Sequence, residues 1–398
     1  MLCVLGLDRL ARSLVIAYFL FFFFCLVRHR RSAALGLEVG VARSSPLKGT
    51  LPTSSHLARP RKRPEPVHFA EDHSNLDLHF PRTLGKLPKQ RYTATARAGN
   101  DEVLRLLRSD KVFVAARLSY KGAEAQVAQA MILGNTKSAG TQLLKDATIN
   151  AGIYPMTQDG VAAYAKELSR SLAELTEDDL IAAFDYSTRP NGEIASLESK
   201  LSRAKVYPNR FLEPWYFPEN PWSSALAGKT VLVIAAMVES FRCQMREDRR
   251  PTIWSHVNSS ILPEFSIKYV PSVQSCCGLR PHASWTESLK VMQKAIDAVG
   301  HFDVALVAAG AYGFPLAAYC RRKHNRSAIV IGGGLQLLFG VKGNRWEKHP
   351  IIRPLFGSQW IYPLLSEVPK QANLVEGACY WGPKALSLEY CPATRGKK

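Results

Sequence analysis

A strand, a glycine turn, a helix, a second strand and a glycine-rich loop follow one another in residues 302–346, FDVALVAAGAYGFPLAAYCRRKHNRSAIVIGGGLQLLFGVKGNRW. The two apolar runs, 304–309 and 328–331, are short, uncharged and partly β-branched, which is typical of strands covered on both faces. Each run ends where a glycine begins a helix or a loop. This order constrains the fold more than any other feature, because it predicts a parallel sheet with ligand sites at the strand ends.

The chain from about residue 96 repeats this alternation. Further strands are expected at 112–118, 181–184, 230–236 and 266–271, and helices at 102–107, 123–133, 160–175, 239–246, 284–300 and 314–323. Ser284 and Glu287 form a capping-box signature for the helix at 284–300. The pattern predicts an α/β fold, with an N-terminal α/β part in 96–225 and a Rossmann-like, mostly parallel sheet in 226–398, where a C-terminal tail wraps the domain. The proline- and aromatic-rich segment 214–229 marks the boundary.

Residues 13–27, SLVIAYFLFFFFCLV, are uncharged and almost wholly apolar. They fall short of the roughly 20 residues that span a bilayer comfortably, although a phenylalanine-rich segment flanked by arginines can span it. Because a cleaved signal peptide rarely has so basic a downstream flank, a retained anchor in residues 1–35 is favoured. A plastid or secretory leader stays open as the alternative. The expected location is a membrane, with a single N-terminal pass and an endomembrane or Golgi-like setting. The topology stays open.

The formal net charge is +19, and much of it lies in or beside the predicted Pro/Arg/Ser-rich linker at 36–95. Between residues 28 and 66, nine Lys and Arg residues face two glutamates, a net charge of +7. Such a stretch is usually a solvated linker, so nucleic-acid binding is not expected. The eight cysteines contain no CxxC pair, which argues against zinc, and their spacing does not assign disulfides. GxSxG, HExxH and Walker motifs do not occur, so neither a hydrolase triad nor an NTPase is supported.

The junction that contains Gly310, Tyr312 and Gly313 is the first candidate ligand contact. It differs from GxGxxG, and no acidic residue follows at the distance that would hold a ribose, so a nicotinamide cofactor is disfavoured. A phosphate contact and a tight turn that needs glycine for steric reasons both stay open.

The triplet Gly332, Gly333 and Gly334, followed by Gln336, is the second candidate. Three consecutive glycines are costly to order, which favours close approach of a ligand or of another backbone. Downstream, Lys342 and Arg345 could contact phosphate, and Trp346 could stack on a base or sugar. The alternative is a solvated basic loop with a buried tryptophan.

Other polar residues lie near predicted strand ends. Glu124 follows Arg117 across a short loop and could bind a metal, act as a base or pair with Arg117. Glu347 is the carboxylate closest in sequence to the glycine triplet. Three further residues are secondary candidates: Asn150 in a turn, and Ser240 and Gln244, which are four apart and therefore share a helix face.

Five segments together, GKTVLVI, ESFRCQ, FDVALVAAGAYGFPLAAY, IVIGGGLQLLFGVKGNRW and VEGACYW, resemble a little-described family of bacterial and algal proteins that looks like a relative of glycosyltransferases with the GT-D fold. The resemblance covers roughly residues 100–390. It implies a donor site at Gly332, Gly333, Gln336, Lys342, Arg345 and Trp346. In GT-D enzymes an early Asp-x-Glu motif holds a metal; here Glu124 matches the last acid, and Gly122 stands in place of the first.

The resulting hypothesis is a membrane-anchored glycosyltransferase that moves a sugar from a nucleotide-sugar donor to a glycan or lipid-linked acceptor. Glu124 would serve as the base or as the ligand of a divalent metal, manganese or magnesium, with Glu347 as the competing assignment. The alternative is a non-catalytic protein that binds a nucleotide or sugar phosphate with the same fold. The donor sugar, acceptor, stereochemical outcome and oligomeric state stay open.

Overall fold

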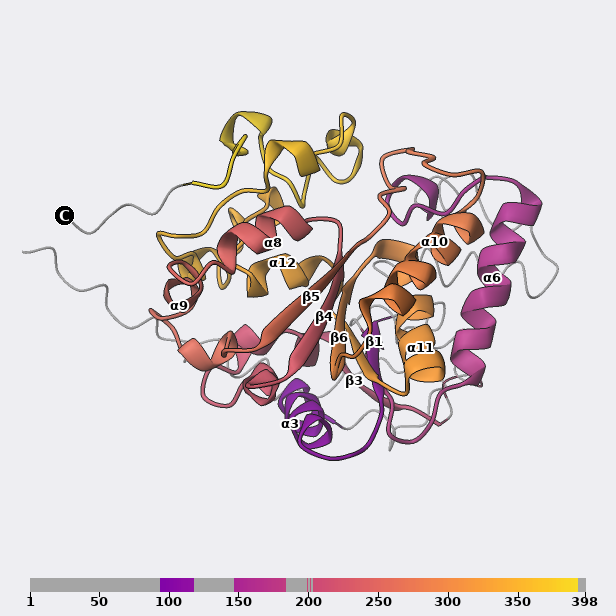
Figure 1. Cartoon of the computed structure of the whole chain (residues 1–398), viewed down its shortest axis with the longest axis horizontal. Helices are drawn as coiled ribbons and strands as arrows, with labels where there is room; N and C mark the ends of the chain where they lie inside the picture. Colours follow the sequence, from indigo (N-terminus) through magenta and orange to yellow (C-terminus); the bar gives the residue numbers. More distant parts are fainter. Residues whose placement is uncertain (1–93, 118–146, 184–198, 200, 202, 393–398) are drawn as a thin grey trace, which may run out of the picture. The chain divides into compact units, whose positions relative to one another are not determined.

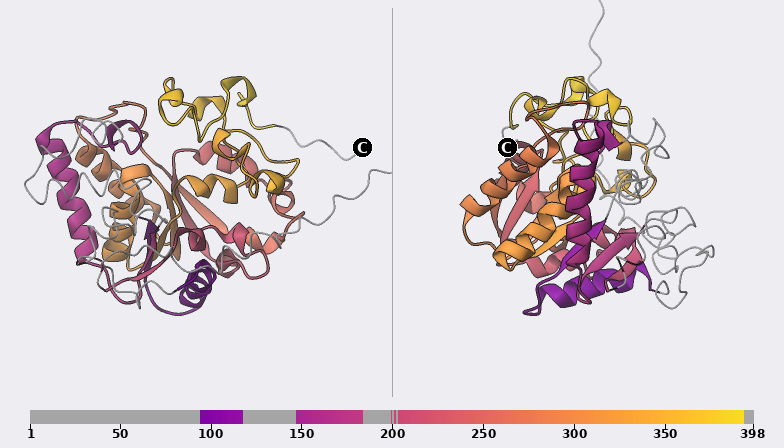
Figure 2. Two further views of the ribbon diagram at one scale, coloured as in Figure 1. Left: turned by 180° about the vertical axis from the view of Figure 1, so that it is seen from behind. Right: turned by 90° about the vertical axis from the view of Figure 1, so that its right-hand side faces the viewer.

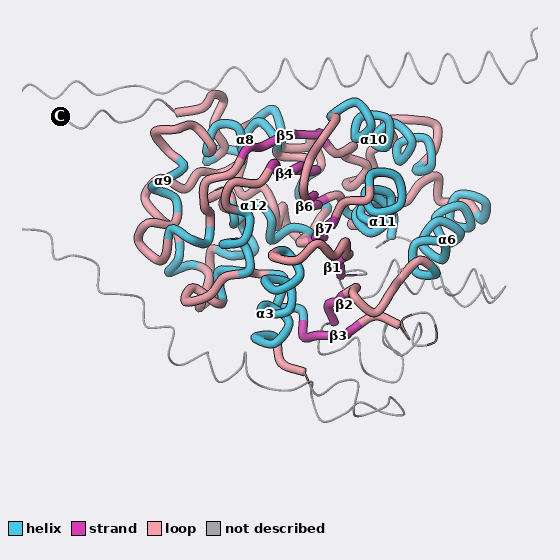
Figure 3. The backbone as a smooth tube through the Cα atoms, turned by 60° about the horizontal axis from the view of Figure 1, so that its bottom comes forward, coloured by secondary structure: helices cyan, strands magenta, loops and turns pink. Residues whose placement is uncertain are grey.

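Seven parallel strands form one sheet in the computed structural model, which describes residues 94–117, 147–183, 199, 201 and 203–392. All of these residues belong to one unit of the chain, 64–398. The strands in spatial order are β3 (Lys205–Pro208), β2 (Leu180–Ala183), β1 (Val114–Arg117), β7 (Ser327–Val330), β6 (Val304–Ala308), β4 (Thr230–Ala235) and β5 (Ser266–Pro271). Figure 3 shows this order across the sheet. The α/β fold expected from the sequence is confirmed.

The central strands are largely apolar because both of their faces are buried. In β4, Val231, Val233 and Ala235 belong to one hydrophobic cluster, whereas Leu232 and Ile234 belong to the other. Successive side chains of a strand point to opposite faces, so one continuous apolar run supplies both layers. Burial on both faces explains why apolar residues in these strands are continuous and do not alternate with polar residues.

Helices cover both faces (Figure 1). One face carries α6 (Gln158–Ala173), α10 (Trp285–Val299) and α11 (Gly313–His324). The other carries α3 (Ala96–Leu107), α8 (Val238–Gln244), α9 (Arg250–Ile253) and α12 (Leu335–Leu338). The two further views in Figure 2 show the same separation.

Helix α10, which Ser284 caps, follows the predicted capping pattern. The Ser284 side chain accepts a hydrogen bond from the Glu287 amide, and the Glu287 carboxylate accepts one from the Ala283 amide at 2.9 Å. Gly300 follows α10 with a φ of +75°, which favours glycine. Local chemistry therefore defines both ends of this helix.

Two features of the sheet differ from the sequence prediction. Strand β3, KVYP, was not expected, because it is a four-residue edge strand that includes an exposed lysine. The C-terminal strands do not form a separate sheet, since Val114 of β1 pairs with Ala328 of β7.

Helix α3 begins at Ala96 rather than 102, because Thr95 caps it by accepting a hydrogen bond from the Ala98 amide. The predicted helix at 123–133 lies outside the described residues.

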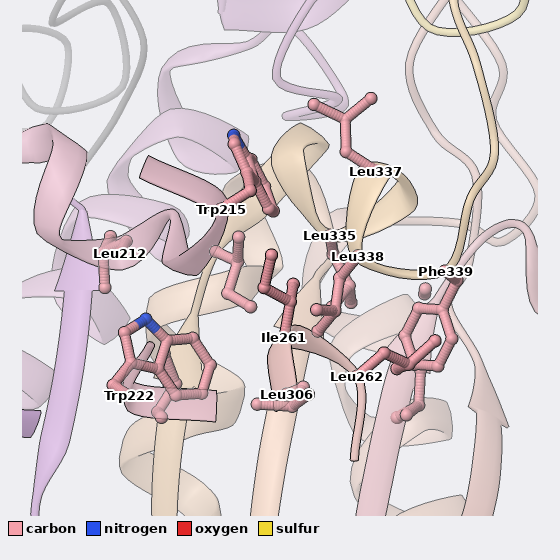
Figure 4. Close-up of a cluster of buried hydrophobic side chains, with 14 of the residues drawn as sticks. Leu212, Trp215, Trp222, Ile261, Leu262, Leu306, Leu335, Leu337, Leu338 and Phe339 are labelled. Atoms are coloured by element: carbon pink, nitrogen blue, oxygen red, sulfur yellow. The ribbon is translucent and has the colours of Figure 1, made fainter. Parts of the chain in front are cut away.

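The proline-rich segment that was expected to mark a boundary lies in the core. Trp215 and Trp222 are 1% and 0% exposed, and they belong to the same hydrophobic cluster as Leu306 of β6 and Leu335 of α12. Figure 4 shows these side chains in one region. The segment thus packs between the sheet and the helices that cover this face.

The chain leaves neighbouring strands toward opposite faces. After β6 it enters α11 on one face, and after β7 it enters α12 on the other. Such a reversal separates the outgoing loops at the carboxyl ends of the strands, where α/β sheets bind ligands.

The C-terminal segment, residues 339–392, contains short 3₁₀ turns and two isolated β-bridges, Val341–Ile361 and Leu364–Leu388. It lies beside α8 in Figure 1, and a disulfide joins its Cys391 to Cys243 of α8. Within the described residues, no helix is both long and apolar enough to cross a bilayer. The predicted anchor at 13–27 and linker at 36–95 lie outside those residues, apart from the last two positions of the linker.

Candidate functional site

Arg117, the last residue of β1, lies against the backbone of Gly332 at the end of β7. A Cβ atom on Gly332 would overlap the guanidinium of Arg117. Gly332 also has a φ of +66°, a left-handed conformation that glycine adopts readily. The absence of a side chain thus lets the arginine approach the turn between β7 and α12.

The next two glycines receive other side chains of the same chain. A Cβ on Gly333 would overlap the ring of Tyr380, and one on Gly334 would lie 3.3 Å from Cη2 of Trp215. Gly332 and Gly334 are buried, whereas Gly333 is half-buried. Close packing of three segments is therefore sufficient to require this glycine triplet, and little of Gly332 and Gly334 is exposed to solvent.

Tyr380 has a second arginine beside it. The Arg345 guanidinium carbon lies 4.7 Å from the Tyr380 ring centroid, and its Nη1 donates to the tyrosine hydroxyl at 3.4 Å. Arg345 Nη2 donates to Glu376 Oε2 at 2.6 Å and to Cys379 Sγ at 3.4 Å. We call Arg117, Gly332–Gly334, Arg345, Glu376, Cys379 and Tyr380 the arginine–tyrosine cluster.

The electrostatics of this cluster favour positive charge. Burial acts to lower the pKa of Arg345, but Tyr380, Cys379 and Glu376 outweigh burial and raise it overall. Burial raises the pKa of Tyr380, so its hydroxyl stays protonated at neutral pH. Glu376 balances Arg345, and no described carboxylate forms an ion pair with Arg117. The cluster therefore carries one cation without a carboxylate partner among the described residues.

Gln336 and Trp346 lie near the cluster but contact the chain itself. The Gln336 amide nitrogen donates to the carbonyl oxygens of Val341, Lys342 and Tyr380, at 3.3, 3.0 and 3.0 Å. Trp346 is 7% exposed, which leaves little of its face for stacking on a base. Both residues hold the C-terminal segment against the turn after β7.

Lys342 and Glu347 lie in a separate aromatic group. The Lys342 ammonium is 4.7 Å from the ring centroid of Tyr362, and burial lowers its pKa. The Tyr362 hydroxyl donates to one oxygen of Glu347, and Arg353 Nε lies 3.4 Å from the other. Glu347 is thus engaged on both oxygens. The competing carboxylate, Glu124, lies outside the described residues.

The turn at Gly310 and Gly313 packs against its neighbours. Gly310 has a φ of +53°, and a Cβ on it would lie 3.0 Å from the carbonyl oxygen of Ala151. A Cβ on Gly313 would lie 2.9 Å from Cγ1 of Val330. Tyr312 is 1% exposed and stacks on Trp285, with centroids 5.1 Å apart. This geometry supports the steric interpretation of the turn. Asn150 lies in the neighbouring turn, directly before Ala151.

Ser240 and Gln244 share a face of α8, as predicted, and both are fully buried. Ser240 Oγ donates to Glu367 and accepts from the Leu364 amide at 2.8 Å. The Gln244 amide nitrogen donates to the carbonyl oxygens of Gly340 and Gln359, at 2.8 and 3.1 Å. These residues bind the C-terminal segment to α8, and this face is occupied by the chain.

Tyr380, Glu376 and Cys379 were not singled out as site residues from the sequence. They come from an aperiodic segment far along the chain from Gly333, so neither periodicity nor spacing indicates their contact with the turn. Within the described residues, no group of three His, Cys, Asp or Glu side chains could hold a metal ion.

Comparison of the chain with protein-family models, with curated proteins and with solved structures finds no match.

Proposed function

We propose that this protein binds the diphosphate of a nucleotide sugar at Arg117 and transfers the sugar to a glycan or lipid-linked acceptor. One observation carries the proposal: Arg117 lies at the carboxyl end of a central strand, against the turn after β7, without a carboxylate partner among the described residues. A half-buried guanidinium in this position favours an anionic ligand. Loss of a nucleoside diphosphate leaves negative charge on the leaving group, and a positioned cation stabilises that charge.

Arg117 rather than the glycine amides would contact the phosphates. Little of Gly332 and Gly334 is exposed to solvent, whereas a guanidinium presents two parallel N–H donors to phosphate oxygens. Arg345 would position Tyr380, since Glu376 already neutralises it. Arg117 is thus the candidate donor-site residue, and Arg345 supports the turn next to it.

The described residues do not fit a divalent manganese or magnesium ion. Two guanidinium groups lie in the cluster, and its carboxylate, Glu376, already pairs with Arg345. These ions prefer several carboxylate or water oxygens. The proposal therefore assigns the charge-stabilising role to Arg117 and involves no metal-dependent step.

The acceptor-activating base in this proposal is Glu124, seven residues after Arg117 in the sequence. The contacts of Glu347 with Tyr362 and Arg353 favour Glu124 over Glu347. Turnover of E124Q and E347Q separates the assignments: E124Q should bind the donor and lose transfer, whereas E347Q should keep both. The reverse result would assign the base to Glu347.

A non-catalytic binding protein is the second candidate, because Glu376 of the cluster and Glu347 are both engaged by other side chains. Under this candidate, E124Q and E347Q bind the donor like the wild type, and the wild type itself shows no transfer with any acceptor. The remainder of the proposal, a Rossmann-like use of the sheet and membrane anchoring by residues 13–27, rests on the sequence pattern.

Calorimetric titration of the full chain with nucleoside diphosphate sugars tests the proposal. R117A should bind at least about tenfold more weakly, because a hydrogen bond to a charged group contributes ~1.5–3 kcal/mol. R170A is the matched control, since Arg170 lies on α6 and, among the described residues, forms ion pairs with Glu167 and Glu174 at its own helix end. Equal affinities for wild type, R117A and R170A would refute the assignment.

A further inference from the structure

Three cysteines from two distant segments lie in or beside the arginine–tyrosine cluster, of which Cys379 is a member. Cys276 and Cys277 are adjacent in the loop between β5 and α10, and their sulfur atoms are 3.7 Å apart. Cys379 of the C-terminal segment is close enough to interact electrostatically with both. All three are free thiols.

The surrounding loop holds the two adjacent sulfurs in place. The Cys277 amide donates to the carbonyl oxygen of Ile149 at 2.8 Å, and Cys277 has a φ of +60°, which is unusual for a residue with a side chain. Directly before Cys276, Ser275 Oγ donates to the carbonyl oxygen of Gly152 at 2.7 Å and contacts the Tyr312 hydroxyl at 2.8 Å. The pair therefore sits in a constrained backbone.

The three cysteines differ in their exposure to solvent. Cys276 is half-buried, whereas Cys277 is 0% exposed and Cys379 is 3% exposed. A reagent in solution therefore meets Cys276 first. Cys277 is placed to react next, because its sulfur lies 3.7 Å from the sulfur of Cys276.

We propose that Cys276 and Cys277 form a redox-active dithiol, which a small-molecule disulfide such as oxidised glutathione converts into a disulfide between these adjacent residues. The Cys276 thiol loses its proton, and the thiolate attacks one sulfur of glutathione disulfide. One glutathione thiolate leaves, and Cys276 becomes a mixed disulfide. The Cys277 thiol then loses its proton and attacks Cys276 Sγ, which releases the second glutathione. Two protein thiols are oxidised and one glutathione disulfide is reduced.

The interaction between the two sulfurs supports a shared proton. The hydrogen bond with Cys276 lowers the pKa of Cys277, and the same contact with burial raises the pKa of Cys276. The first proton is therefore lost by the pair rather than by one thiol. Cys277 is the more acidic thiol of the pair, and proton transfer from Cys276 to the Cys277 thiolate across the 3.7 Å contact gives the Cys276 thiolate that attacks the glutathione disulfide.

The disulfide formed here would be easy to reduce. Adjacent Cα atoms are about 3.8 Å apart, below the span of roughly 4.4–6.8 Å that disulfides usually bridge. Such a bond is strained, and strained disulfides are the labile ones. By contrast, the Cα atoms of Cys243 and Cys391 are 5.4 Å apart, within the usual span. The chain thus combines an unstrained structural bridge with a reversible pair.

Peptide mass mapping of the folded full chain tests this proposal. The protein is incubated with oxidised glutathione, alkylated and digested. In the wild type we expect the peptide with both cysteines to lose two hydrogens, and dithiothreitol should restore it before it opens Cys243–Cys391. C277S should stop at a glutathione adduct on Cys276, and C276S should form no adduct at Cys277.

C320S is the control, because Cys320 is a buried free thiol in α11; it should react like the wild type. A disulfide from Cys379 to either partner would overturn the proposal. So would full retention of both wild-type thiols under conditions in which the urea-unfolded chain reacts. These readouts measure thiols alone, so they are independent of nucleotide-sugar binding.

Discussion

The guanidinium of Arg117 occupies the space that a side chain on Gly332 would take. Arg117 ends β1, and Gly332 lies in the turn that follows the neighbouring parallel strand β7, so the two residues meet where both strands end. In the sequence, the glycine triplet suggests that a ligand approaches closely. In the structure, the space beside Gly332 is filled by an arginine of the chain itself. This relationship makes the position of Arg117 depend on residue 332, and it permits a test that separates stability from ligand binding.

We expect G332A to weaken binding of the nucleotide sugar at least as much as R117A, because the new Cβ displaces the guanidinium. Its stability cost should be modest, since the displaced atoms are the far end of a flexible side chain and the φ of +66° contributes about 1–2 kcal/mol. G377A is the matched control: Gly377 has the same φ of +66° and has no atom within 4 Å of its Cβ position. Urea unfolding and calorimetric titration measure the two effects.

Similar losses of unfolding free energy in G332A and G377A, with weaker binding only in G332A, would support the role of Arg117. Unchanged donor binding in G332A would contradict it.

Chelation of divalent metals should leave donor affinity unchanged. The cluster supplies cationic groups, and the described residues contain no set of metal ligands. Titration in the presence of excess EDTA, compared with added manganese or magnesium, measures this directly. Binding that disappears with EDTA and returns with manganese would instead support a metal at Glu124.

The sequence predicts the framework of this site better than its contacts. Strands such as Thr230–Ala235 are recognisable because burial on both faces requires continuous apolar runs. The contact of Tyr380 with Gly333 is not recognisable, because it joins distant segments and one of them lacks periodicity. Ser240 and Gln244 illustrate a second limit. Polar residues beside strand ends serve ligands or satisfy buried backbone groups equally well, and here they bind the C-terminal segment.

Glu367 should make stability depend on pH in an unusual direction. Burial raises its pKa above the ordinary value of 4.5, although the Ser240 side chain and the Glu239 and Ser240 amides favour its charged form. The unfolded chain releases this proton at lower pH than the folded chain does. The contribution of Glu367 to stability is therefore fully present below pH 4.5 and declines as pH rises through the folded-state pKa.

Urea unfolding of wild type and E367Q across this range tests the linkage. The stability of the wild type relative to E367Q should fall with rising pH and then level off. E389Q is the control, because Glu389 is exposed in the same segment. A difference between wild type and E367Q that grows with pH would contradict the raised pKa.

The disulfide between Cys243 and Cys391 should stabilise the attachment of the C-terminal segment. It closes a loop with a sequence separation of 148 residues, and such cross-links typically contribute about 2–4 kcal/mol by restricting the unfolded chain. We expect C391A to lower the free energy of unfolding by this amount. The double variant C243A/C391A should lose little more, because both substitutions remove the same bond. C320A measures the cost of removing a buried thiol alone. If C391A unfolds at the same urea concentration as the wild type, the hydrogen bonds of Ser240, Gln244 and Glu367 suffice to hold the segment, and the disulfide adds no stability.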